Sequence, residues 1–230
     1  MKKLLLLMAA LTLVNGLNAQ SNRNEGDMIT LPKPKLESKI SVEEALSGRR
    51  SKRSYQSEPL SLSEVSQLLW AAYGVTKPSA SGLRGGLKTA PSAGATYPLE
   101  VYLVAGEVDG LEKGIYRYLP EHHALQKVFT GDKRAELCAA AHSQSMVRNA
   151  PALIVYTAIY ERTTGRYGSR GKERYVCMDL GHSAQNVYLQ AYSLGIGTCA
   201  VGAFDDSALK KALPVAKNEI PLYIMPLGKI

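Results

Sequence analysis

The feature that most constrains the fold is an apolar run near the middle of the chain. Residues 150–158 read APALIVYTA, with almost no alternation between polar and apolar positions. A strand with one solvent-facing side alternates, whereas a strand covered on both faces does not. We therefore predict a central β-strand sandwiched between two layers. At 230 residues and 45% apolar composition, the chain is long enough to form one domain around that strand.

Helices and strands are predicted on both sides of this run. Two capping boxes, Ser41 with Glu44 and Ser61 with Glu64, each open a segment of helical periodicity. Glycine closes both helices, and no internal repeat is present. Helices are predicted over residues 42–47, 62–73, 132–141 and 174–194 and after Asp205 or Asp206, and strands over 99–105, 114–119, 124–129 and 221–230. This mixture predicts an α+β, three-layer architecture.

The N-terminus has the pattern of a secretory signal peptide over residues 1–19. Lys2 and Lys3 precede an apolar run, and the segment ends in small residues at Ala19. The run is too short for the alternative, an uncleaved transmembrane anchor. We expect cleavage, export to the periplasm and no stable membrane anchor. Residues 20–40 are polar and proline-dotted, which predicts a flexible segment before a domain over residues 41–230.

Charge and cysteine content narrow the function classes. Removing Lys2 and Lys3 lowers the formal charge from +8 to +6, which leaves a basic protein suited to an anionic ligand or surface. No nucleic-acid motif accompanies that charge, so nucleic acid is the last choice. The three cysteines lack CxxC spacing, and the four histidines lack metal-ligand spacing. We predict no metal site; one disulfide remains open, with buried free thiols as the default.

Three segments have the residue types that a cofactor needs. Residues 48–53 read GRRSKR, which offers guanidinium groups and a hydroxyl donor to a phosphate. A solvated basic turn explains this segment equally well. Residues 89–100 read TAPSAGATYPLE, and their small side chains would let a flat ligand approach the backbone. The alternative is a tight loop without a ligand. Residues 195–205 read GIGTCAVGAFD, whose amides can bind a ring carbonyl or simply form a packing turn.

Together these segments resemble the nitroreductase superfamily, closest to its SagB-type or thiazole/oxazole-dehydrogenase branch. The motifs PSAGATYPLEVYLV, GIYRYLPEHHAL, ERTTGRYGSRG, DLGHSAQNVYLQAYSLGIGTCAVGAFDD and PLYIMPLGKI carry the resemblance, which covers residues 41–230. It implies a mostly antiparallel sheet flanked by helices, an obligate homodimer, and two FMN sites at the subunit interface. It also implies ping-pong turnover without a catalytic side chain, since the cofactor does the chemistry.

The resemblance also implies a role for individual residues. Arg49, Arg50 and Ser51 match residues that hold the FMN phosphate, and Arg53 matches the cation near the N1–O2 edge of the ring. The segment Pro91, Ser92, Ala93 and Gly94 matches the part that the partner subunit lays against the cofactor. Gln144 matches an amide near the pyrimidine end, and Gly202 and Ala203 match backbone donors to N5 and O4. Lys229 is the candidate for the last phosphate contact.

The sequence departs from the family pattern at two places. Ala95 stands where many nitroreductases have asparagine, and the chain ends at Ile230 where they have a basic tail. The lysine-tyrosine pair of azoline-oxidising relatives corresponds to Arg166-Tyr167, and arginine is too basic to accept a proton near neutral pH. Tyr167 remains a possible substrate contact.

We therefore expect an FMN-dependent oxidoreductase that exchanges two electrons with a small conjugated acceptor such as a nitroaromatic, quinone or enone. The electron donor stays open among NAD(P)H, a quinol and a redox protein. Because NAD(P)H is scarce outside the cytoplasm, export favours a quinol, a redox protein or turnover as an oxidase. The alternative is a non-catalytic, exported flavin-binding or flavin-scavenging protein.

Overall fold

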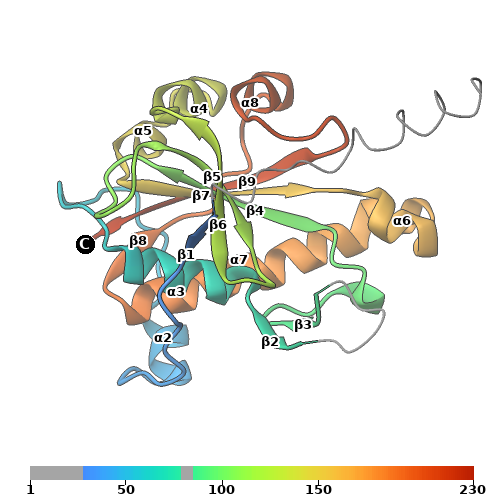
Figure 1. The fold of residues 1–230 in the computed structure, drawn as a ribbon, viewed down its shortest axis with the longest axis horizontal. Coiled ribbons are helices and arrows are strands. Elements are labelled where there is room, and N and C mark those ends of the chain that lie inside the picture. The colour runs from blue at the N-terminus through green and yellow to red at the C-terminus, as the bar shows by residue number, and fades with distance from the viewer. Residues whose placement is uncertain (1–27, 79–84) are drawn as a thin grey trace, which may run out of the picture.

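A seven-stranded sheet forms the middle layer of the protein. The computed structural model describes residues 28–78 and 85–230. Its strand order is β1-β6-β5-β4-β7-β9-β8, and all six strand pairings are antiparallel (Figure 1). The strands are β1 (Met28–Thr30), β4 (Leu99–Ala105), β5 (Gly114–Leu119), β6 (Ala124–Thr130), β7 (Ala152–Ala158), β8 (Ile196–Thr198) and β9 (Ile220–Lys229). The predicted mostly antiparallel α+β fold is thereby confirmed.

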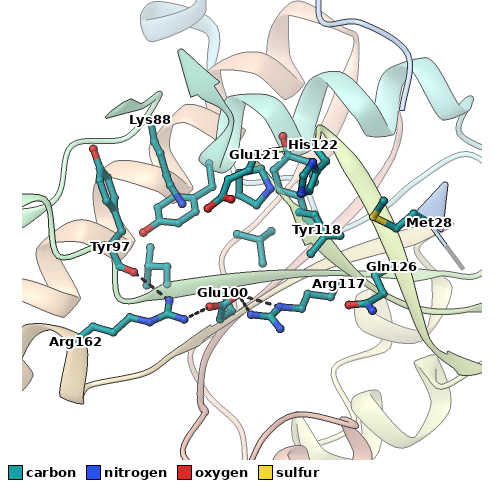
Figure 2. A pocket seen from close by; sticks show the side chains of 15 residues that line it. Met28, Lys88, Tyr97, Glu100, Arg117, Tyr118, Glu121, His122, Gln126 and Arg162 are labelled. Atoms are coloured by element: carbon teal, nitrogen blue, oxygen red, sulfur yellow. Dashed lines mark hydrogen bonds and ion pairs between the residues drawn. The ribbon is translucent and has the colours of Figure 1, made fainter. Parts of the chain in front are cut away.

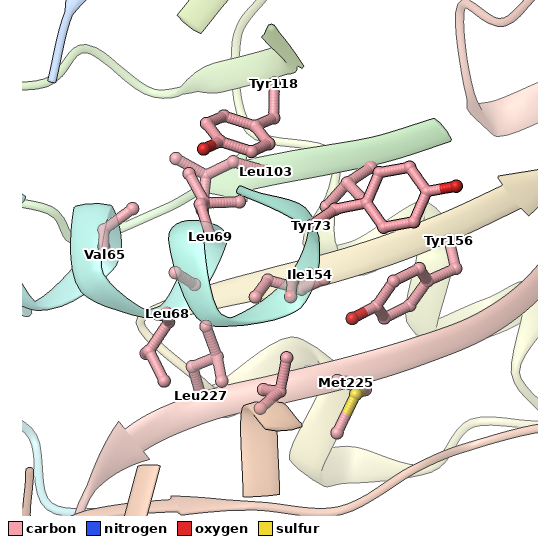
Figure 3. Close-up of a cluster of buried hydrophobic side chains, with 14 of the residues drawn as sticks. Val65, Leu68, Leu69, Tyr73, Leu103, Tyr118, Ile154, Tyr156, Met225 and Leu227 are labelled. Atoms are coloured by element: carbon pink, nitrogen blue, oxygen red, sulfur yellow. The ribbon is translucent and has the colours of Figure 1, made fainter. Parts of the chain in front are cut away.

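The central strands are β4 and β7, and every residue of both is buried. One face of the sheet carries α3 (Leu62–Tyr73) and α7 (Val176–Ser193), and α2 (Val42–Gly48) packs against α7. The other carries α4 (Arg134–Ala140), α5 (Ser145–Asn149) and α8 (Asp206–Ala212), so an apolar cluster lies on each side. Figure 3 shows Leu68 and Leu69 of α3 beside Leu103 and Ile154 of the sheet. The unalternating run at 150–158 is apolar because both of its faces are covered.

Side-chain caps set the starts of three helices. The reciprocal capping box of Ser61 and Glu64 is present, and the Ser41 hydroxyl accepts from the amide of Glu44. The Asp205 carboxylate accepts from the amide of Ala208 and caps α8. Asp132 was predicted to cap α4, but the helix begins later, at Arg134, and Asp132 bonds the amide and guanidinium of that residue instead.

The long helix predicted to begin at residue 174 begins at Val176, because a π-helical turn precedes it. That turn spans Gly171–Tyr175 and joins α7 to α6 (Glu161–Tyr167). No periodic signal predicted α6, α5 or the short hairpin of β2 (Val75–Lys77) and β3 (Leu87–Lys88). The helix α5 and the strands β2 and β3 are too short for a period to emerge. The helix α6 is as long as α2 but lacks the side-chain cap that marks the start of α2.

The expectation of a flexible segment up to residue 40 is wrong from Met28 onward. Strand β1 pairs with β6, and Leu31 is 4% exposed. The ring of His123 and the hydroxyl of Ser66 both bond the carbonyl of Pro32, at 2.9 and 2.6 Å. A three-residue strand followed by prolines is difficult to predict from composition. The same prolines are found in flexible segments and at the ends of edge strands. The predicted signal peptide and residues 20–27 lie outside the described residues. So do residues 79–84 of a glycine- and serine-rich loop, 79–86, that the sequence predicts to be mobile.

Candidate functional site

A small cavity of about 150 Å³ lies where the end of α2 meets α7 and β8. Three cations and two hydroxyl-bearing aromatic rings surround it. We call it the arginine cavity. Its lining residues are Gly48, Arg49, Arg50, Lys52, Tyr188, Tyr192, Ile196, Thr198 and Ile230. The cavity therefore contains the predicted phosphate-binding arginines. It adds Tyr188, together with Lys52 and Thr198, which lie in two of the segments noted in the sequence but were given no role of their own.

Close packing fixes this corner. A Cβ on Gly48 would overlap the end of the Tyr192 ring, so glycine leaves room for that ring against the end of α2. Ser51 then forms a parallel bridge with Thr198, and the amide of Lys52 donates to the Thr198 carbonyl at 2.9 Å. The basic segment is thus held against β8 by backbone contacts. One nitrogen of the Arg50 guanidinium, Nη1, also donates to the carbonyls of Ser47 and Arg49.

The hydroxyl of Tyr188 organises the donors around the cavity. It accepts from the amide of Ala200 at 2.7 Å and lies 3.1 Å from Oγ of Ser51. Either hydroxyl of this pair can donate to the other, and in the arrangement in which Tyr188 donates, the Ser51 proton is free for another acceptor. The Arg49 guanidinium lies 5.2 Å from the centroid of the Tyr188 ring. Each of these groups favours an anion in the cavity.

Thr198 supplies the most informative atom of the site. Its side chain is 2% exposed, and its Oγ1 has no hydrogen-bond partner among the described residues. Buried polar atoms without a partner are rare and call for an explanation such as a missing ligand. A hydroxyl left unpaired beside Arg49, Arg50 and Lys52 fits an anionic oxygen atom.

The segment after Thr198 connects this cavity to Gln144. Cys199 is hydrogen bonded to Tyr55, and burial raises the pKa of its thiol despite that bond and the nearby Arg53. A protonated thiol is a packing residue rather than a redox nucleophile. Further along, the side-chain amide of Gln144 donates to the carbonyl of Ala203 at 3.0 Å. The structure therefore brings Arg49–Arg53, Gln144, Gly202 and Ala203 into one continuous region.

Lys229 is close to this region, but its amino group and its carbonyl bind residues outside the cavity lining. Its amino group forms an ion pair with Glu58 at 3.4 Å, and its carbonyl accepts from the amide of Gln56. Its side chain does not line the cavity, whereas Lys52 does. The prediction that Lys229 supplies the last phosphate cation fits the structure less well than Lys52 in that role.

The predicted cofactor segment Pro91–Gly94 lies elsewhere. Asp179, near the start of α7, accepts from the Ser92 hydroxyl at 2.6 Å and from the Ala93 amide at 3.1 Å. Ser92 also accepts from the amide of Tyr97, so its hydroxyl both donates and accepts inside the chain. Asp179 and Tyr188 are about 14 Å apart along the helix axis. A single chain therefore does not bring segment 91–94 against the arginine cavity.

Asp179 gives a testable pH dependence. Burial raises the pKa of its carboxyl above the ordinary 3.8, in opposition to the bonds from Ser92 and Ala93 and to His182. A raised folded-state pKa favours the protonated form, so this group adds stability below its unfolded pKa and loses it as the pH rises through the folded value. The Asp179→Asn variant has no carboxyl to titrate at this position, so its unfolding free energy should no longer contain the pH-dependent contribution of Asp179. Urea titration at several pH values measures this in the parent and the variant. An unchanged pH profile would contradict it.

A larger cavity, of about 570 Å³, lies at a different place (Figure 2). Tyr97 and Lys88 lie on one side of it, and Figure 2 shows Arg117 and Arg162 reaching toward Glu100. Both guanidiniums bind Glu100, at 2.7 and 2.5 Å. None of the predicted cofactor residues lines this cavity, and the charged cluster is satisfied internally. The small arginine cavity is accordingly the better candidate for the cofactor.

Comparison with known proteins decides the family. The sequence profile described as the nitroreductase family matches residues 46–229. The chain belongs to the nitroreductase family. A Methanocaldococcus jannaschii protein named as a candidate nitroreductase is 47% identical over 204 residues, which cover 89% of this chain and 98% of that protein. The Escherichia coli microcin B17-processing protein McbC is 27% identical over 177 residues, 74% of this chain and 63% of McbC.

A solved structure agrees with this assignment. A candidate nitroreductase from Ralstonia eutropha superposes with a TM-score of 0.73 at 29% identity, covering 88% of this chain and 89% of that one. The resemblance to the family, and to the branch that the microcin-processing protein represents, is thereby confirmed. Family membership supports a general oxidoreductase role. Within residues 28–78 and 85–230 no group of histidine, cysteine, aspartate or glutamate could hold a metal ion, and no helix is long and apolar enough to span a membrane.

Proposed function

We propose that the protein is an FMN-dependent oxidoreductase whose two active sites lie at the interface of a homodimer. Each site would combine the arginine cavity of one subunit with segment 91–94 of the other. The observation that carries this proposal is the buried, unpaired hydroxyl of Thr198 among Arg49, Arg50 and Lys52. A phosphate monoester satisfies that hydroxyl and those cations together.

The other residues fit the remaining parts of FMN. The amides of Gly202 and Ala203 have no acceptor in the described part of the chain, and both residues are exposed, so they can donate to ring atoms. Arg53 lies close enough to Cys199 and Tyr55 to affect the pKa of both. Its charge is therefore near the segment that would contact the ring. Bound FMN would supply two-electron exchange, in alternate steps with a donor and with a small conjugated acceptor.

The distance between the two halves of the site supports the dimer. Segment 91–94 is fixed to Asp179, about 14 Å along α7 from Tyr188. A second copy of the chain would place an equivalent segment beside the arginine cavity. Such a closed twofold arrangement creates two equal sites.

The unpaired hydroxyl gives a specific prediction for Thr198→Val. Valine keeps the shape and removes a buried hydroxyl without a partner, so the cofactor-free protein should be as stable as the parent or slightly more stable. The same change should weaken FMN binding about five- to tenfold, because one phosphate hydrogen bond is lost. Thermal unfolding with and without FMN measures both effects. A destabilised cofactor-free protein with unaltered FMN affinity would contradict the proposal.

A redox experiment separates the enzyme from a non-catalytic flavin carrier. The FMN-loaded protein is reduced anaerobically with dithionite, and menadione or nitrofurazone is then added while the flavin absorbance is followed. Rapid return of the absorbance supports the enzyme. A flavin that stays reduced supports the carrier, and a protein that takes up no FMN contradicts both.

We also propose export through the segment 1–19. The electron donor would then be a quinol or a redox protein rather than NAD(P)H. Cell fractionation and the N-terminal sequence of the native protein test this. A mature protein that begins at Gln20 outside the cytoplasm is the expected result, and a cytoplasmic protein that retains Met1 is the contradicting one.

A further inference from the structure

The region from α6 to the start of α7 carries a group of unpaired cations. Arg166, Arg170, Lys172 and Arg174 are all exposed. No carboxylate of the described residues lies within ion-pairing distance of any of them, although Glu161 and Glu173 are neighbours in sequence. We call these four residues the α6 cations. Their charge is not neutralised within the chain, so it is available to an anion.

Aromatic rings lie between these cations. Tyr167 and Tyr175 meet edge to face with their ring centroids 4.9 Å apart. The guanidinium of Arg166 lies 5.4 Å from the Tyr167 centroid, and that of Arg170 lies 5.7 Å from the Tyr175 centroid. Arg170 also donates from Nε to the Tyr175 hydroxyl at 2.9 Å. The guanidiniums are thus held beside the rings, which suits a ligand that is both flat and negatively charged.

The α6 cations adjoin the segment that the proposed function lays against the cofactor. Arg166 donates from Nη1 to the carbonyl of Gly94 at 3.3 Å. A Cβ on Gly94 would be 2.4 Å from the Tyr167 hydroxyl, so the ring lies directly against the turn. Figure 1 shows α6 beyond the end of β7, beside the start of α7. A molecule approaching the turn at residues 91–94 from this side meets these side chains.

We propose that this surface selects planar anionic electron acceptors of the aromatic carboxylate class. A carboxylate takes a charge-assisted, two-pronged contact from Arg166 or Arg170, while its ring packs against Tyr167. A neutral acceptor of the same shape gains the ring contact alone. The identity of these molecules as substrates rests on the proposed function, whereas their binding to the surface does not.

Calorimetry with an unreactive pair of ligands tests the binding directly. Naphthoate should bind the FMN-loaded protein about tenfold more tightly than naphthamide, which has the same ring and no charge. Arg166→Gln with Arg170→Gln should abolish that preference, and added salt should reduce it. Arg166→Lys should keep part of it, because the charge remains and the fork is lost. The matched control, Arg148→Gln with Lys211→Gln, removes two exposed cations from α5 and α8 and should leave the preference intact.

Kinetics tests the same surface in turnover. The ratio of kcat/KM for para-nitrobenzoate to that for para-nitrobenzamide should fall about tenfold in the Arg166→Gln, Arg170→Gln variant, with the amide largely unaffected. Equal binding of naphthoate and naphthamide by the parent protein would overturn the inference. So would a control variant that loses the preference equally. Failure of FMN to bind would contradict the proposed function instead. The flavin absorbance spectrum of the protein detects that failure separately.

Discussion

Replacing Arg49 with alanine is expected to weaken FMN binding by about 1.5–3 kcal/mol, which is the scale of a hydrogen bond to a charged group. The guanidinium lines the small cavity together with the unpaired Thr198 hydroxyl, and it forms no ion pair with any described carboxylate. Its charge is therefore available to the phosphate. Calorimetric titration of FMN into the parent and the variant measures the difference.

Riboflavin provides the control for Arg49→Ala, because it has the same ring system and lacks the phosphate. The variant should bind riboflavin as the parent does, since Arg49 would contact the phosphate alone. Arg148→Ala, an exposed arginine on α5, should change neither affinity. Equal losses for FMN and riboflavin would mean that Arg49 supports the fold of the site instead. An unaltered FMN affinity would remove Arg49 from the site.

The largest effect on stability is expected from Ile154→Ala. Ile154 is fully buried on β7, directly opposite Leu103 of β4, and Figure 3 shows it beneath α3. Truncation removes buried methyl groups and leaves a cavity that close-packed neighbours fill only in part, at a cost of about 2–5 kcal/mol. Equilibrium urea denaturation, with the cooperativity of the transition as a check, measures it.

Leu36→Ala is the matched control for the core substitution, because Leu36 is 80% exposed. It should change the unfolding free energy by less than about 0.5 kcal/mol. A similar, small loss in both variants would contradict the assignment of β7 as the centre of the core.

The sequence predicted the elements that have enough length for a period. Capping boxes placed α2 and α3, and the apolar run placed β7 to within two residues. It failed at Met28–Thr30, because pairing with β6 depends on residues almost a hundred positions away. The π-helical turn before α7 was also missed, since a Tyr, Arg and Lys-rich stretch gives the same local signal in an α-helix.

The candidate site was predicted in part. Motif resemblance pointed to the arginines after α2 and to Gln144, Gly202 and Ala203, and the structure places these in one region. Tyr188, Thr198 and Asp179 were missed because their importance comes from single hydrogen bonds, or from the lack of one, that only the tertiary structure reveals. Tyr188 and Tyr192 are one helical turn apart, which was the available hint that two hydroxyls point to one place.

A mixed dimer tests the central claim that each FMN site is built from two subunits. Arg49→Ala damages the phosphate end, and Gly94→Val damages the turn, since Gly94 has a φ of 57° and a Cβ there meets Tyr167. Each homodimer should bind FMN poorly. If the site is shared, a purified heterodimer of the two variants contains one site in which Arg49 and Gly94 are both intact, so it should bind one FMN with parental affinity. A heterodimer that binds FMN no better than its two parents would contradict the claim.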